Sequence, residues 1–200
     1  MSTRLKQKQN RRSEDREGDV LKGLAAGVVA GLVASWTMNQ FQALLSRLAA
    51  GYERSHGAQS LQQGLPEHGI GRELQEQGVD EPQDTAPARL AQAISVNLFN
   101  RELTESEKES AGTVFHYVMG TTSGALYGAV AELIPEVKAG AGFPFGAFVW
   151  LAVDEGLVPA AGLSKSPMDY PLSVHAYALA SHMVYGVTTE LVRRAVRNAL

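Results

Sequence analysis

Four stretches of the chain contain no charged side chain, and charge-rich segments separate them. They run from Gly23 to Ser46, Ala111 to Ala131, Ala139 to Val153 and Tyr170 to Thr189. About 20 mostly apolar helical residues cross a bilayer core about 30 Å thick, and three of the stretches meet that length. The third continues past Asp154 and Glu155 to Ser164 without further charge. The pattern predicts membrane helices at residues 20–46, 105–134, 139–163 and 170–196.

The predicted fold class is all-α, with four transmembrane helices. Glycine and proline crowd both ends of the third segment, at Gly140, Gly142, Pro144, Gly146, Gly156, Pro159 and Gly162. We therefore expect that helix to be kinked or broken. Alanine and glycine replace much of the leucine and isoleucine of a strongly apolar span, so a soluble Ala/Gly-rich helical bundle is the alternative.

The segments outside the predicted spans are polar. Residues 1–19 carry both acidic and basic side chains and show no hydrophobic periodicity, which predicts a disordered cytoplasmic arm. Residues 47–110 predict a long polar loop, in which Leu90, Ile94 and Leu98 form one apolar stripe of an interfacial helix near 87–100. Thr104 and Glu107 have the spacing of a capping box for the helix that follows.

Glycine recurs at every fourth position in two of the predicted spans. The positions are Gly23, Gly27 and Gly31 in the first span, and Gly120, Gly124 and Gly128 in the second. Glycine at this spacing forms a flat groove that lets another helix approach closely. The stripes predict packing of the two helices on each other or between subunits. A glycine-lined pathway is the alternative.

Several ionisable side chains fall inside or at the ends of the predicted spans. They are His116, Glu132, Asp154, Glu155, His175, His182 and Glu190. Such groups are costly in a bilayer and usually face a bundle interior or a cavity. They predict either hydrogen-bonded ties between helices or a proton or ion path. A metal site is a third hypothesis, but the two-turn separation of His175 and His182 is too long for one ion.

Composition narrows the possible chemistry. The 200 residues include 18 basic and 21 acidic side chains, for a net charge of -3, so we expect no nucleic-acid partner. The chain has no cysteine, which excludes thiol nucleophiles and cysteine-ligated metals. No nucleophile and base pair or cofactor-binding motif is identifiable. We therefore expect no catalytic residue, no bound metal and no cofactor.

Basic residues flank the first and last predicted spans. Lysine and arginine close to spans favour the cytoplasmic side, and here they precede residue 23 and follow residue 190. Both termini are therefore expected in the cytoplasm, with an even number of crossings. Acidic residues before Gly23 argue against the alternative that the first apolar run is a signal peptide.

The last span also carries a family resemblance. The sequences Ser181-His182-Met183-Val184-Tyr185 and Glu190-Leu191-Val192-Arg193-Arg194 resemble the closing helix of the YagU-like family of bacterial inner-membrane proteins, whose function is unknown. Tyr127 and Gly128 ahead of Ala131-Glu132 and Pro135 fit the same layout. The resemblance implies a four-span inner-membrane protein and transfers no catalytic residue. The 47–110 connection departs from the family.

Three functional hypotheses follow. The first is a structural or interaction protein of the bacterial inner membrane, for which a stress-related role is one interpretation. Its expected partners are the lipid bilayer and a second copy or another membrane protein. The second is a small proton, ion or solute conduit that uses the intramembrane histidines and carboxylates. The third is the soluble bundle.

Overall fold

The computed structural model describes residues 2–63, 86–164 and 166–200, and all regular structure in these ranges is helical. The all-α prediction is therefore confirmed. The α-helices are α1 (Ser2–Gln63), α3 (Ala86–Phe99), α4 (Glu105–Leu133), α5 (Phe143–Val149), α6 (Val158–Ala160) and α7 (Leu172–Ala199). Short 3-10 helices, η2 (Pro135–Lys138) and η4 (Pro167–Asp169), precede α5 and α7, and a π-helix, η3 (Trp150–Leu157), joins α5 to α6.

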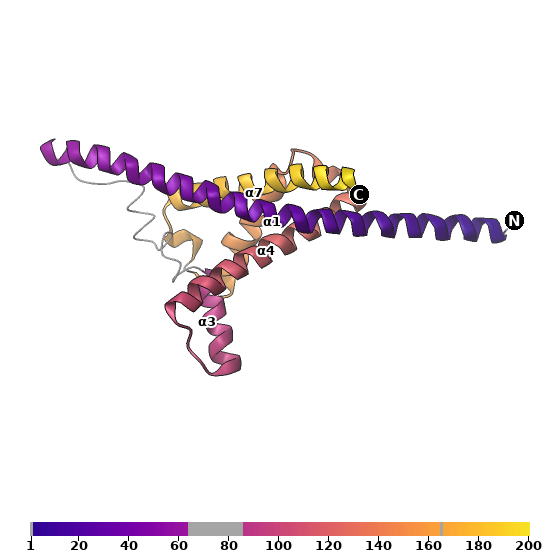
Figure 1. Cartoon of the computed structure of the whole chain (residues 1–200), viewed down its shortest axis with the longest axis horizontal. Coiled ribbons are helices and arrows are strands. Elements are labelled where there is room, and N and C mark those ends of the chain that lie inside the picture. Colours follow the sequence, from indigo (N-terminus) through magenta and orange to yellow (C-terminus); the bar gives the residue numbers. More distant parts are fainter. Residues whose placement is uncertain (1, 64–85, 165) are drawn as a thin grey trace.

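Two long helices pack on the middle of α1 (Figure 1). Gly23 of α1 lies against Gly128 of α4, and Gly31 lies against Gly120, so the two helices run in opposite directions. Helix α7 is also antiparallel to α1, because Arg197 at its end binds Asp19 near the beginning of the packed part of α1. The contacts make α1, α4 and α7 the centre of the molecule.

The chain reverses direction from each packed segment to the next. After α4, η2 turns the chain so that α5 runs back along α7, with Gly142 at Gly186 and Gly146 at His182. The ends of α4 and α7, the η2 turn and residues near Asp19 therefore share one end of the bundle, which we call the terminal end. We call the opposite end, which holds η4, the far end.

The centre of this bundle is built from small side chains. Ala26, Ala30 and Ala34 of α1 are fully buried, as are Ser181 and Thr189 of α7. Tyr127, Tyr185 and Met38 are the large apolar side chains buried among the described residues. Leucine, valine and phenylalanine, which normally fill a soluble core, lie mostly on the outside.

Helix α1 is longer than the sequence predicted. The expected disordered arm (1–19) is helical from Ser2, and the helix continues from the predicted span into the expected polar loop as far as Gln63. Both extensions are rich in Arg, Lys, Gln, Glu, Leu and Ala, which favour helix. Residues 2–63 contain no proline to end it. The low apolar content of residues 1–19 was therefore not a sign of disorder, because these residues have high helix propensity. Most of the loop's middle, residues 64–85, lies outside the described residues.

The third predicted segment is irregular, but not in the way that its glycines suggested. Gly140 and Gly142 adopt positive φ in the turn before α5, as their lack of a Cβ allows. From Phe143 to Ala160 the chain is helical without a break, and Trp150–Leu157 is wound as a π-helix, a winding that commonly bends a helix. The pattern of apolar residues predicts where a helix lies, but it does not distinguish an α-helix from a π-helix.

The predicted capping box at the start of α4 is confirmed. The Thr104 hydroxyl accepts a hydrogen bond from the Glu107 backbone N–H, and the Glu107 carboxylate accepts one from the Thr104 N–H at 2.9 Å. Arg101 also binds the Glu107 carboxylate at 2.6 Å. The Thr104 backbone bond, followed by Arg101, lowers the pKa of Glu107 from 4.5 to about 2.

We expect Thr104→Pro, which removes the donating N–H, to raise the pKa of Glu107 toward 4.5. The folded-state pKa is the lower one, so the carboxylate's contribution to stability is complete above pH 4.5 and disappears as the pH falls through about 2. An NMR titration of the Glu107 carboxyl carbon measures the shift. Ser110→Ala, which leaves the cap intact, is the control, and an unchanged pKa in Thr104→Pro contradicts the assignment.

Candidate functional site

The structure divides the seven predicted ionisable residues between two clusters. His116, Asp154, Glu155, His175 and His182 lie toward the middle and far end of the bundle, where α4, η3 and α7 hold them. Glu132 and Glu190 lie at the terminal end, among arginines of α7.

At the far end, His175 joins α7 to the segments that precede it. Its Nδ1 lies 2.6 Å from a Glu155 carboxylate oxygen, and its Nε2 lies 2.9 Å from the carbonyl oxygen of Pro167. Because Nε2 faces a carbonyl oxygen, it donates a hydrogen bond there, and a second proton lies between Nδ1 and the Glu155 carboxylate. The ring thus holds η3, η4 and the start of α7 together.

Nearer the middle, His182 of α7 faces Asp154 of η3. The His182 Nδ1 lies 3.6 Å from an Asp154 oxygen and 2.9 Å from the carbonyl oxygen of Ala178 one turn earlier. His116 of α4 is half-buried, and its Nε2 has no hydrogen-bond partner among the described residues. The buried Trp150 Nε1 of η3 likewise has no hydrogen-bond partner among the described residues.

At the terminal end, Glu190 is fully buried and is the centre of an ion cluster. It accepts hydrogen bonds from Arg193 Nε at 2.7 Å, Arg193 Nη2 at 3.0 Å and the Tyr127 hydroxyl at 3.0 Å. Arg194 Nε binds Oε1, the oxygen that also accepts from Arg193 Nη2. Glu190 lies past Thr189, outside the charge-free part of α7. The bonds from Arg193 and Arg194 compensate the burial of this carboxylate.

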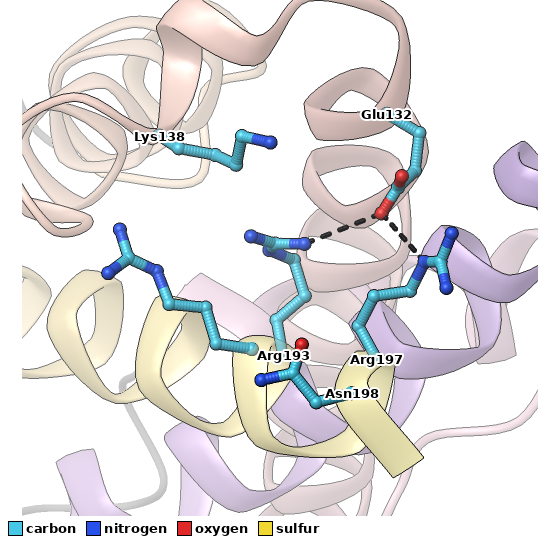
Figure 2. Close-up of a pocket in the computed structure, with 6 residues that line it drawn as sticks. Glu132, Lys138, Arg193, Arg197 and Asn198 are labelled. Carbon is cyan, nitrogen blue, oxygen red and sulfur yellow. Dashed lines mark hydrogen bonds and ion pairs between the residues drawn. The ribbon is translucent and has the colours of Figure 1, made fainter. Parts of the chain in front are cut away.

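Glu132 extends the cluster to the other two helices. One of its oxygens lies 3.5 Å from Arg193 Nη1 and 3.1 Å from Arg197 Nε (Figure 2). Arg197 Nη2 also binds Asp19 of α1 at 2.7 Å. The cluster therefore connects α1, α4 and α7 at their common end.

Most of this cluster was not predicted from the sequence. We predicted Glu132 and Glu190 but treated Arg193, Arg194 and Arg197 only as a basic flank. Glu190 stands three and four residues before Arg193 and Arg194, a spacing that places them on one helix face. That spacing was visible in the sequence. The participation of Tyr127 and Asp19 depends on helix packing, which the sequence did not reveal.

The two glycine stripes face each other within one chain. A Cβ on Gly124 would lie 2.6 Å from the Gly27 carbonyl oxygen and 2.6 Å from the Gly31 Cα, and the other stripe positions meet backbone or Ser35 equally closely. A second close contact joins α5 to α7, where a Cβ on Gly186 would lie 2.6 Å from the Gly146 nitrogen. This second contact was not predicted from the glycine spacing.

The described residues contain no group of three or more His, Asp or Glu side chains arranged to hold a metal ion. Within them, two helical segments are long and apolar enough to cross a membrane, Glu17–Leu48 and Phe143–Ala160. Helices α4 and α7 are also long, but their His, Ser, Thr and Tyr side chains make them more polar.

These features describe an all-helical protein with close helix contacts and membrane-length apolar segments. The model of the family "Protein of unknown function (DUF1440)" matches residues 70–191, more than half of the chain, and the chain belongs to that family. The match includes α3, α4, the third segment and most of α7, and it excludes α1 and the three arginines after Leu191. No curated protein and no solved structure matches the chain.

Proposed function

We propose that the chain is a four-span protein of the bacterial inner membrane, with both termini in the cytoplasm, and that its role is structural or interactive. The resemblance of its last span to the YagU-like family favours the same placement. The polar clusters then serve as ties that hold closely packed helices together.

The distribution of small and large side chains carries this proposal. Apart from the ion-paired Glu190, the fully buried side chains are those of alanine, serine and threonine, whereas Leu126, Phe148 and Leu157 are 62%, 66% and 58% exposed. Water disfavours such a surface, but lipid tails solvate it. Membrane helices associate through small residues because lipid already satisfies the large apolar ones.

The path of the chain supports four crossings. The packed segments alternate in direction. Helices α1, α4 and α7 extend between the two ends of the bundle, and the Phe143–Ala160 helix runs from the level of Gly186 toward the far end. The basic side chains at the terminal end are Lys22, Lys138, Arg193, Arg194 and Arg197. Basic residues favour the cytoplasmic side, which places this end in the cytoplasm and the far end outside.

A partner would bind a surface other than the glycine stripes, because α1 and α4 already bury them against each other. The exposed leucines and valines of α1, including Leu24, Leu32 and Val29, are available to lipid, to a second copy or to another membrane protein. We propose association through these faces.

Fractionation and cysteine labelling test the placement. The protein should remain in the membrane pellet after an alkaline carbonate wash. Because the chain has no cysteine, single substitutions report one position each. With a membrane-impermeant maleimide, Met168→Cys should react in intact spheroplasts, Ala199→Cys only after lysis, and Leu126→Cys only in denaturant.

A soluble bundle gives the opposite results. The protein would then leave the pellet, and Leu126→Cys would react readily without denaturant, since that side chain is 62% exposed. Reaction of Ala199→Cys in intact spheroplasts would instead reverse the orientation.

One observation favours a second candidate function, a proton or ion conduit. The π-helix η3 places Asp154 and Glu155 against His182 and His175, and π-helical segments often occur at functional sites. Histidines and carboxylates at different levels of a bundle are groups that can relay protons.

Flux measurements in vesicles separate the two candidates. A conduit predicts pH-dependent flux above that of empty liposomes, reduced by His182→Ala or Asp154→Asn. Glu136→Gln, which removes an exposed carboxylate in η2, is the control. Wild-type flux equal to that of empty liposomes excludes the conduit and leaves the structural role.

A further inference from the structure

The ion cluster at the terminal end also forms the floor and wall of an open pocket. Its volume is about 410 Å³, and it is lined by Glu132, Lys138, Arg193, Arg194, Arg197 and Asn198. In Figure 2, Lys138 reaches toward it from η2, and Arg193, Arg197 and Asn198 rise from α7.

We propose that this pocket binds the phosphate of an anionic phospholipid headgroup from the cytoplasmic leaflet. The inference rests on the proposed membrane placement, which puts the terminal end at the bilayer surface. Basic pockets between membrane helices on this side are suited to phospholipid headgroups.

The charge around the pocket is favourable to an anion. Four cationic side chains surround it, against the carboxylates of Glu132 and the buried Glu190. Arg197 also pairs with Asp19 of α1, so three carboxylates leave an excess of one positive charge. A phosphodiester supplies one negative charge, and a headgroup with two phosphates supplies two or more.

The carboxylates fix the arginines without using all of their donors. Glu190 engages Arg194 through Nε alone, so the terminal nitrogens of Arg194, whose side chain is 51% exposed, have no partner among the described residues. The Lys138 ammonium likewise forms no hydrogen bond or ion pair within the described part of the chain. Arg193, only 3% exposed, holds the wall in place between Glu190 and Glu132.

The surroundings favour a lipid over free phosphate. Leu191 lies one helical turn before Arg194 on α7 and is 58% exposed, and Leu133 beside Glu132 is 54% exposed. These side chains offer acyl chains an apolar surface next to the charged pocket. A free phosphate would gain nothing from them.

Native mass spectrometry of the wild-type protein in neutral detergent tests the proposal. The probes are phosphatidylglycerol and phosphatidylcholine of equal chain length at equal mole fraction. We expect preferential retention of phosphatidylglycerol. Each basic side chain near an anionic surface contributes a factor of about five, so Lys138→Gln should lower the preference about fivefold and Lys138→Gln/Arg194→Gln further.

The control removes the same charge elsewhere. Arg47→Gln/Arg101→Gln changes two basic residues away from the terminal end and should keep the wild-type preference. All variants are compared at matched Tm and elution volume, and Lys138→Gln leaves every described ion pair intact, so misfolding does not obscure the result.

Three outcomes overturn the proposal. They are equal retention of the two lipids by wild type, equal loss in the pocket and control variants, and release of bound phosphatidylglycerol by millimolar inorganic phosphate with phosphate binding in its place. The last outcome assigns the pocket to free phosphate. If carbonate releases the protein from membranes, the placement itself fails; retention without lipid preference removes only this inference.

Discussion

Gly124→Ala should destabilise the protein although alanine favours helix over glycine. The added Cβ would lie 2.6 Å from the Gly27 carbonyl oxygen and from the Gly31 Cα, and backbone atoms of a packed helix cannot rotate away. Helices α1 and α4 must therefore separate, which disturbs the buried alanines of α1. Overpacking of this kind costs about 1–3 kcal/mol. Thermal unfolding in detergent measures the change as a lower Tm.

Gly18→Ala is the matched control for this prediction. Gly18 also lies in α1, but a Cβ there would meet nothing within 4 Å. Alanine should stabilise that position by up to about 1 kcal/mol, its helix propensity advantage. The two substitutions are thus expected to shift Tm in opposite directions. A neutral or stabilising Gly124→Ala would mean that α1 and α4 do not make this contact.

The combined variant Gly27→Ala/Gly124→Ala provides a stricter test. The two glycines face each other across the same contact, so one methyl group already forces the helices apart. The second methyl should then cost less than it does alone, a non-additivity expected for residues in contact. Additive losses would mean that the two glycines do not face each other.

The glycine contacts show which features of helix packing the sequence predicts and which it does not. Regular spacing identified Gly23, Gly27 and Gly31 and their counterparts in α4, because the helical period is a local property. It did not identify Gly186, which is alone in α7 and becomes a contact only through its partner Gly146. Which glycine packs against which depends on the assembled fold. A single glycine in a helix therefore gives no periodic signal in the sequence.

The ionisable residues show the same limit. The sequence identified Asp154, Glu155, His175 and His182, since charge inside an apolar run is conspicuous. It could not pair them, because pairing depends on the π-helical winding of η3 and on the antiparallel path of α5 and α7. At the terminal end the sequence identified the two carboxylates but not their arginine partners. The positive-inside rule already accounted for the arginines, so no contact was expected of them.

Removing the Glu190 carboxylate should produce a large loss of stability. Glu190→Gln leaves Arg193, which is 3% exposed, without its main counterion and weakens the bond from the Tyr127 hydroxyl. Breaking a buried pair by neutralising one partner typically costs about 3–5 kcal/mol, because the other charge remains buried and unpaired. The midpoint of denaturant unfolding in detergent measures it, with Glu136→Gln, at an exposed position, as control.

The double variant Glu190→Gln/Arg193→Met separates the loss of the pair from the burial of a stray charge. Replacing both members by uncharged side chains removes the unpaired guanidinium, and such replacements are often close to neutral. Glu132 keeps Arg197 at 3.1 Å, and the half-exposed Arg194 can turn to solvent. We therefore expect the double variant to be more stable than Glu190→Gln alone. A double variant less stable than either single one would mean that the pair itself, rather than the neutralised charge, stabilises this end of the bundle.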